Sequence, residues 1–332
     1  MKTRLPIVDS FDRVHRNLRI SVTDRCNIRC VYCMPEDVTF LPASDILSFE
    51  EIERVVKLTV EMGINRVRLT GGEPLVRREL WRLIGALKKI DGLNDIGMTT
   101  NGILLEKHAA DLKRAGLDRL NISLDTLDRE QFRKLTRRDE LDRALAGIAA
   151  ARDAGFENTR INAVSMAGIT EQEVVPLAKF CRENSLELRF IEFMPLDGDQ
   201  NWQTGNVLKG SDIRAMIEAE VGRLKTAERH YDAQPAMDFQ YTDGKGSVGF
   251  INPVSQPFCG SCDRLRLTAE GKLRNCLFST VEWDLRNAIR CGKTDDELDT
   301  LIRECVKAKK AGHGIDSNEF ERPQRAMYQI GG

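Results

Sequence analysis

The sequence lacks a long hydrophobic run. Its longest uninterrupted apolar stretch, Ala144 to Ala151, is far shorter than the roughly 20 residues that a membrane-spanning helix needs. Met1 to Arg16 have no apolar signal-peptide core, and the chain contains no internal repeat and no low-complexity tract. We therefore expect a cytoplasmic protein that has no membrane partner.

An excess of one charge sign is also missing. The 332 residues include 50 basic and 51 acidic side chains, so the formal net charge is −1. Duplex nucleic acid rewards a strong basic excess, so we expect no nucleic-acid partner. Hydrophobic residues make up 41% of the chain, which favours a folded core over disorder. At roughly 150 residues per domain, the length fits one large domain or two modest ones.

Cysteine is too scarce for a disulfide scaffold, yet six of the nine cysteines lie in two groups. One group of three runs from Cys26 to Cys33, and the other runs from Cys259 to Cys276. In a reducing compartment, clustered thiols indicate metal ligands or catalytic groups rather than disulfide bridges.

Short β-rich runs alternate with segments of helical periodicity. The expected strands are 18–22, 66–70, 96–100, 120–124, 160–164 and 188–193. The expected helices are one that covers 52–60 and ends at Gly63, followed by 78–90, 106–115, 142–154 and 173–184. After residue 198 we expect a helix at 211–220, a hairpin near Asp243 and a helix-rich stretch to about 310. This alternation predicts an α/β fold whose parallel sheet closes wholly or partly into a barrel.

The segments that follow the six strands carry polar and turn-forming residues. They begin Thr23-Asp-Arg-Cys, Gly71-Gly-Glu-Pro, Thr100-Asn-Gly, Asp125-Thr, Ser165-Met and Met194-Pro. Parallel βα sheets bind ligands at the carboxyl ends of their strands. We therefore expect these segments to face one common site.

The first cysteine group has the spacing Cys26-x3-Cys30-x2-Cys33. Three thiolates on one short loop suit zinc or an iron–sulfur cluster. A structural zinc site needs a fourth ligand, and neither His nor Cys follows within a short span. The spacing favours a [4Fe–4S] cluster with one open iron, with Tyr32 beside the ligand of that iron. A zinc site completed from a distant residue is the alternative.

The second group, Cys259-x2-Cys262-x13-Cys276, leaves a similar choice. Because Cys291 follows 15 residues later, four cysteines could form a zinc staple. However, two arginines, Arg264 and Arg266, directly follow the Cys-x2-Cys pair, and a purely structural staple has no use for them.

The first cysteine spacing, together with Gly71-Gly-Glu-Pro after the second strand, resembles the radical S-adenosylmethionine superfamily. The resemblance implies a partial (β/α)6 TIM-like barrel, and an open iron that chelates the amino and carboxylate groups of S-adenosylmethionine. Glycines without a Cβ would let backbone groups approach the amino end of that ligand.

Four segments narrow the resemblance to the GTP 3′,8-cyclase family of molybdenum cofactor biosynthesis, from about residue 10 to the end of the chain. They are Leu18-Arg-Ile-Ser-Val-Thr-Asp-Arg-Cys, Asn121-Ile-Ser-Leu-Asp-Thr, the segment 258–278 around the second cysteine group, and the terminal Gly331-Gly332. The family implies two [4Fe–4S] clusters, the second held by Cys259, Cys262 and Cys276 with an iron free for guanine. Cys291 is then a bystander.

The resemblance also assigns roles to individual residues. S-adenosylmethionine is expected to bind Tyr32, Gly72, Ser123 and Met194. GTP is expected to bind Arg19, Arg68, Thr99, Arg160, Arg264, Leu265 and Arg266. The residues expected to take part in catalysis are Arg264, Arg266, Gly331 and Gly332. The family usually has Lys where this chain has Arg160. The planar guanidinium of Arg binds oxygens as a fork, whereas the Lys ammonium acts as a point charge, so we expect phosphate binding to be retained with a different geometry.

The implied reaction converts GTP to 3′,8-cyclo-7,8-dihydro-GTP, the first step of molybdenum cofactor (molybdopterin) biosynthesis. A 5′-deoxyadenosyl radical removes the C3′ hydrogen, and the C3′ radical attacks guanine C8. The implied partners are GTP, an electron donor such as flavodoxin, and cyclic pyranopterin monophosphate synthase as receiver of the product. We expect a monomer or homodimer, with residues 1–225 as the barrel and 226–332 as the second-cluster and GTP-binding region. A radical S-adenosylmethionine peptide or sulfatase maturase and a zinc-stapled binding protein are the alternatives.

Overall fold

The computed structural model describes residues 4–229, 231–318 and 320–331. In chain order its strands are β1 (Asn17–Ser21), β2 (Arg66–Thr70), β3 (Asp95–Thr100), β4 (Arg119–Ser123), β5 (Arg160–Ser165), β6 (Glu187–Glu192), β7 (Leu224–Thr226), β8 (Met237–Tyr241), β9 (Ser247–Ile251), β10 (Arg264–Leu267), β11 (Lys272–Arg274) and β12 (Trp283–Asp284). Its α-helices are α1 (Phe49–Glu61), α2 (Leu80–Leu87), α3 (Leu105–Ala115), α4 (Arg129–Thr136), α5 (Leu141–Asp153), α6 (Val174–Glu183), α7 (Gly210–Glu220), α8 (Leu285–Arg290), α9 (Asp295–Lys307) and α10 (Met327–Ile330). The strands and helices expected up to residue 193 are all present, with ends displaced by a few residues.

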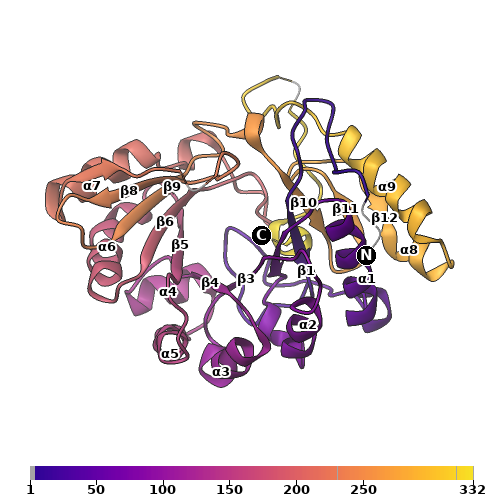
Figure 1. Cartoon of the computed structure of the whole chain (residues 1–332). Coiled ribbons are helices and arrows are strands. Elements are labelled where there is room, and N and C mark those ends of the chain that lie inside the picture. The colour runs from indigo at the N-terminus through magenta and orange to yellow at the C-terminus, as the bar shows by residue number, and fades with distance from the viewer. Residues whose placement is uncertain (1–3, 230, 319, 332) are drawn as a thin grey trace.

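The described strands form one sheet in the order β12-β11-β10-β1-β2-β3-β4-β5-β6-β9-β8-β7. Each of β1 to β6 runs parallel to the next, and helices return the chain between them. Figure 1 shows the sheet curving into an arc with α1 to α5 on its outer side. Because β12 and β7 end the order without being neighbours, the arc stays open over the described residues. The expected α/β fold with a partial barrel is confirmed.

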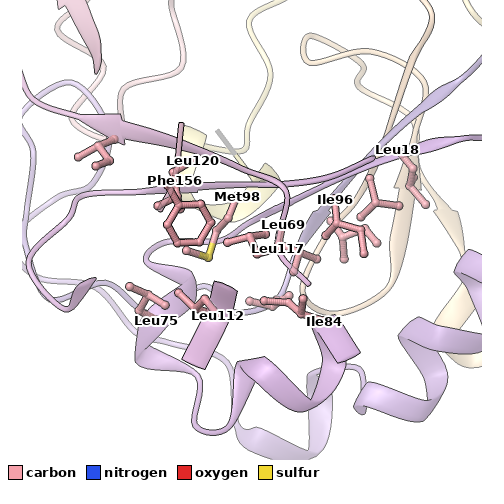
Figure 2. Close-up of a cluster of buried hydrophobic side chains, with 14 of the residues drawn as sticks. Leu18, Leu69, Leu75, Ile84, Ile96, Met98, Leu112, Leu117, Leu120 and Phe156 are labelled. Atoms are coloured by element: carbon pink, nitrogen blue, oxygen red, sulfur yellow. The ribbon is translucent and has the colours of Figure 1, made fainter. Parts of the chain in front are cut away.

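The two faces of the sheet differ because side chains alternate along each strand. Buried apolar side chains point toward the helices, including Leu18 on β1, Leu69 on β2 and Met98 on β3. Figure 2 shows them packed with Ile84 of α2 and Leu112 of α3. The intervening positions are polar, as the sequence Asn-Leu-Arg-Ile-Ser of β1 illustrates. The core therefore lies outside the arc, and the inner face of the arc is polar.

Capping residues fix the ends of several helices. Ser48 accepts a hydrogen bond from the backbone N–H of Glu51, whose side chain bonds back to the N–H of Ser48, so α1 begins with a capping box. Beyond its end lies Gly63 with φ +100°. α3 ends at Gly116, whose φ of +99° favours glycine. The sequence did not predict α4, which begins after its cap Asp128.

Residues after 198 extend both ends of the sheet. Beyond β6, strands β9, β8 and β7 continue it, and the β8–β9 hairpin confirms the turn expected near Asp243. At the other end β10 pairs in parallel with β1, so that Arg266 lies opposite Arg19. We did not predict a strand at this place. The expected helix at 211–220 is α7, and α8 and α9 fill the helix-rich stretch. No helix in the described ranges is long and apolar enough to cross a membrane.

Candidate active site

A cavity inside the arc joins the two cysteine groups. Its lining includes the thiols Cys26, Cys30, Cys33, Cys259, Cys262 and Cys276. It also includes the expected site residues Arg19, Tyr32, Gly72, Thr99, Ser123, Met194, Arg264 and Arg266. Of the remaining expected residues, Arg68, Arg160, Leu265 and Gly331 lie outside this lining, and Gly332 lies outside the described residues. The structure thus brings most of the expected residues to one place.

The first cysteine group lies on the loop after β1. The backbone N–H groups of Cys33 and Met34 donate to the carbonyl of Cys30 at 2.9 and 3.0 Å, which folds the loop into a tight turn. Arg29 donates to the backbone carbonyl of Cys26 at 2.8 Å. Burial, followed by the charge of Glu73, raises the pKa of the Cys26 thiol to about 11. Without a positive partner such as a metal, these thiols stay protonated.

The second group occupies a cationic environment instead. Cys259 and Cys262 lie in one turn, where the Cys262 N–H donates to the carbonyl of Cys259 at 3.1 Å. Arg264 donates through Nη2 to the Sγ of Cys262 at 3.4 Å, and Lys309 donates to the same sulfur at 3.5 Å. Burial opposes ionisation of Cys262, but these two cations outweigh it and lower its pKa to about 6. This sulfur is therefore poised as a thiolate.

The donor set fits a cluster better than a single metal ion. No three described His, Cys, Asp or Glu side chains come close enough to hold one ion. A [4Fe–4S] cluster spaces its cysteine sulfurs more widely because each sulfur binds a different iron. Both groups offer three free thiols facing one cavity. The four-cysteine zinc staple would need Cys291, which is exposed at the end of α8 and lies outside the cavity.

The Gly71-Gly-Glu-Pro segment packs directly on the first cysteine loop. The Gly72 N–H donates to the carbonyl of Thr23 at 2.7 Å, and the next N–H donates to Arg25 at 2.8 Å. A Cβ on Gly72 would lie 2.4 Å from the carbonyl oxygen of Arg25, and a Cβ on Gly71 would lie 2.6 Å from that of Thr23. We expected these glycines to make room for a ligand. In the structure they make room for the backbone of the cysteine loop.

Glu73, which sequence reasoning did not single out, fastens this segment to the end of β3. One carboxylate oxygen accepts hydrogen bonds from Thr100 Oγ1 at 2.8 Å and from the Leu75 N–H at 3.0 Å, and the other accepts from the Asn101 N–H at 2.7 Å. The side chain is buried, and burial raises its pKa to about 7 despite these bonds. Its position in the Gly-Gly-Glu-Pro motif was the available signal.

Tyr32 lies between two cysteines and reaches across to β4. Its hydroxyl donates to Asp125 at 2.6 Å, and Asp125 also accepts from the N–H of Val164 at 2.8 Å. Burial raises the pKa of Asp125 to about 6. Ser123, at the end of β4, and Met194, after β6, line the cavity nearby. The four residues expected to hold S-adenosylmethionine thus line the same cavity as the first cysteine group, and Met194 also shares an apolar cluster with Cys276 of the second group.

Arginines form a row across the inner face of the sheet. Arg19 on β1 lies between Arg266 on β10 and Arg68 on β2 in the strand register. The neighbour of Arg68 on β3 is Gly97, where a Cβ would lie 3.9 Å from the Arg68 guanidinium carbon. Burial, followed by the charges of Arg266 and Arg264, pushes the pKa of Arg19 well below its ordinary value. The structure records no ion pair between Arg19, Arg68 or Arg266 and a described carboxylate, so the row lacks a carboxylate partner among the described residues.

Two expected GTP-binding residues are placed differently. Arg160 on β5 pairs with Glu187 on β6 at 2.8 Å, so its charge is already partly balanced. Leu265 is fully buried within the main hydrophobic core. Because side chains alternate along β10, the Leu265 side chain points away from the arginine row, and only its backbone is available to a ligand.

The C-terminal segment enters the space between the two cysteine groups. Ile330 of α10 is buried with Leu196 and Phe278. Gly331 adopts φ +71°, and a Cβ there would lie 2.5 Å from Thr70 Oγ1. Its carbonyl accepts a hydrogen bond from Arg266 at 2.5 Å. Figure 1 shows this end of the chain inside the arc of the sheet.

Comparisons with known proteins agree with this arrangement. Residues 20–181 match the family model of the radical SAM superfamily, and residues 186–315 match that of molybdenum cofactor synthesis C. The chain is similar to the GTP 3′,8-cyclase of Rhodopirellula baltica, with 52% identity over 100% of this chain and 94% of that protein. It is also similar to the GTP 3′,8-cyclase of Corynebacterium glutamicum, with 46% identity over 98% of this chain and 89% of that protein. Streptococcus suis SuiB bound to S-adenosylmethionine shares the fold, with a TM-score of 0.60, 18% identity and coverage of 95% of this chain and 77% of that chain.

Proposed function

Because this chain belongs to the GTP 3′,8-cyclase family of the radical S-adenosylmethionine superfamily, we propose that its cavity binds GTP and S-adenosylmethionine together. The enzyme converts GTP to 3′,8-cyclo-7,8-dihydro-GTP, the first step of molybdenum cofactor biosynthesis, with S-adenosylmethionine and [4Fe–4S] clusters as cofactors. The observation that carries this function is one cavity lined by two separate groups of three thiols.

We assign one cluster to each group of thiols. Cys26, Cys30 and Cys33 hold the first cluster, and Cys259, Cys262 and Cys276 hold the second. Each group leaves one iron without a protein ligand, because a cubane cluster has four. Tyr32, Gly72, Ser123 and Met194 hold S-adenosylmethionine beside the first cluster. When bound, that cofactor pair supplies the radical that removes the C3′ hydrogen of GTP.

The arginine row holds the triphosphate of GTP. Arg19, Arg68 and Arg266 present guanidinium groups that lack a described carboxylate partner, and guanidinium forks match phosphate oxygens well. Arg264 and Thr99 bind GTP beside this row, and Leu265 contributes through its backbone. Arg160 also binds a phosphate, although Glu187 already balances part of its charge. Anchoring the triphosphate fixes the ribose and base relative to the first cluster, which is what a radical reaction requires of its protein.

The C-terminal tail closes the site. Arg266 acts on both sides, since it faces the proposed phosphate site and holds the carbonyl of Gly331. Glycine leaves no side chain between Thr70, Ser21 and the cavity. We propose that Gly331 and Gly332 exclude water from the reacting ribose.

The remaining partners follow from the chemistry. A one-electron donor such as flavodoxin reduces the first cluster, and cyclic pyranopterin monophosphate synthase receives the product. The reaction takes place in the cytoplasm, where nine thiols stay reduced. Residues 1–225 form the barrel and residues 226–332 the second-cluster and GTP-binding region, in a monomer or homodimer.

Anaerobic turnover tests the function. The protein is reconstituted to about eight irons per chain and incubated with S-adenosylmethionine, a reductant and GTP. We expect 5′-deoxyadenosine and the cyclised nucleotide to form together, and to form only when GTP is present. ATP in place of GTP is the control. Equal 5′-deoxyadenosine with both nucleotides and no cyclised product would contradict the proposal.

A further inference from the structure

Lys309 is a buried cation beside the second cysteine group. It follows the end of α9, and the residue is only 4% exposed. Its ammonium donates to the Sγ of Cys262 at 3.5 Å and to the backbone carbonyl of Arg264 at 3.0 Å. No ion pair with a described carboxylate is recorded for it. The sequence Lys307-Ala-Lys-Lys is typical of a solvated helix end, so sequence reasoning missed this residue.

A buried ammonium needs a negative partner. Lysine is almost never fully buried unless it is paired, since removing the charge from water costs several kcal/mol. Two carboxylates in this region bond to other groups: Asp9 is held by Arg13 at 2.6 Å, and Asp263 accepts from Asn17 through one oxygen, although the charge of Lys309 also acts on Asp263. The favourable charges acting on Lys309 are those of the Cys262 and Cys276 sulfurs. The acidic side chain that the Lys309 ammonium contacts directly is therefore Cys262 of the second group.

The N-terminal segment holds the backbone next to Lys309 in place. Arg13 donates to the carbonyl of Lys310 at 2.8 Å and to that of Ala311 at 3.1 Å. The same guanidinium donates to the carbonyl of Cys259 at 2.7 Å. One side chain thus ties the segment that carries Lys309 to the turn that carries two of the second-group thiols.

The first cysteine group has no such cation. The recorded polar contacts of its sulfurs among the described residues are with the Asn27 and Asn101 amides, the Tyr32 side chain and the backbone of Asn27, Ile28 and Tyr328, and none of these groups is a cation. Arg29 bonds to the backbone carbonyl of Cys26 rather than to a sulfur. Among the described residues, a cation in hydrogen-bond contact with a cysteine sulfur is therefore recorded for the second group and not for the first.

We propose that Lys309, anchored by Arg13, is a positioning residue that balances the thiolate charge of the second cluster and raises its reduction potential. This inference rests on the proposed assignment of that cluster to Cys259, Cys262 and Cys276. Hydrogen bonds and positive charge near cluster sulfurs favour the reduced state, because reduction adds negative charge.

The test isolates the second cluster in the full-length chain. Cys26, Cys30 and Cys33 are all changed to Ala, so that only the second cluster gives an electron paramagnetic resonance signal. Into this parent we introduce Lys309→Met, Lys309→Arg or the control Lys310→Met, which removes the same charge from an exposed neighbour. Iron content and an anaerobic redox titration are measured for each.

We expect Lys309→Met to lower the midpoint potential, by at least a tenfold change in the one-electron reduction equilibrium. Lys309→Arg should restore most of the loss, and Lys310→Met should leave the potential unchanged. A parent without its roughly four irons overturns the cluster assignment and this inference together. Four irons and an unchanged potential in Lys309→Met overturn the inference alone.

If Lys309→Met does not retain its irons, Lys309→Gln is titrated in its place under the same criterion. If neither neutral variant retains them, cluster retention becomes the measurement. Retention in Lys309→Arg then supports a charge-balancing role, and loss in Lys309→Arg overturns it.

Discussion

Arg266 donates a hydrogen bond to the backbone carbonyl of Gly331, although 65 residues separate them in the chain. Arg266 lies opposite Arg19 in the sheet, within the row of arginines that faces the cavity. The C-terminal tail and the proposed triphosphate site therefore share one guanidinium. A substitution in the tail should therefore affect the proposed triphosphate site, and a substitution at that site should affect the position of the tail.

Gly331→Ala should abolish cyclisation while leaving most of the fold intact. The new Cβ would lie 2.5 Å from Thr70 Oγ1 and would force the tail out of the cavity. Gly292→Ala is the matched control: Gly292 also has positive φ, but a Cβ there meets nothing within 4 Å. Both variants bear the left-handed backbone cost of about 1 kcal/mol. Turnover and thermal unfolding are measured for each, and equal activity of the two would contradict a role for the tail.

Arg264→Ala and Arg266→Ala should weaken GTP binding by about tenfold to a hundredfold, the usual cost of losing one hydrogen bond to a charged group. The first cluster should be unaffected, because the recorded hydrogen bonds of Arg264 and Arg266 go to Cys262 and Gly331 and not to a thiol of the first cysteine group. Equilibrium binding of GTP and the iron content are the measurements. Normal GTP affinity in both variants would remove them from the binding site.

Cys276→Ala should separate the two halves of the reaction. Radical initiation at the first cluster should persist, seen as 5′-deoxyadenosine, but no cyclised product should form. Iron should fall from about eight to about four per chain. Cys291→Ala serves as the comparison, because Cys291 is exposed and outside the cavity. A full iron count in Cys276→Ala would show that this thiol is not a ligand.

His15 should make stability depend on pH. Its ring is buried, and burial, followed by the charge of Lys309, lowers its pKa to about 4. In the unfolded chain it titrates near 6.5, so the unfolded state binds a proton first as the pH falls, and stability is lost between 6.5 and 4. Between about pH 7.5 and 5.5, this group should cost roughly 1 kcal/mol of the free energy of unfolding. Urea unfolding of the holoenzyme and of His15→Gln gives the difference, and parallel pH dependence in both would contradict it.

The first six strands could be predicted because each repeats the same local signal, a short apolar alternation followed by a polar turn. The segments after these strands were expected to face one common site, and several of their residues do line one cavity together with both cysteine groups. α4 escaped prediction because only Phe132 and Leu135 are strongly apolar among its eight residues. β10 was not predicted because its partner, β1, is far away in the chain. The local sequence Arg264-Leu-Arg-Leu does not indicate which strand it pairs with.

Some details of the site could have been predicted from the local sequence. Alternation within Arg264-Leu-Arg already places the Leu265 side chain on the opposite face from its neighbours. Others depend on tertiary contacts that leave no local trace. The pairing of Arg160 with Glu187 and the burial of Lys309 beside Cys262 both join residues from separate segments.

The position of β10 also constrains how the protein is made. β1 is an early strand in synthesis, yet one of its edges pairs with β10, which begins only at Arg264. Until the ribosome has passed that point, the nascent chain carries β1 as an open edge, with unpaired N–H and C=O groups. During most of translation the half-built sheet is therefore a template for pairing with other chains, and its protection depends on roughly the last fifth of the polypeptide.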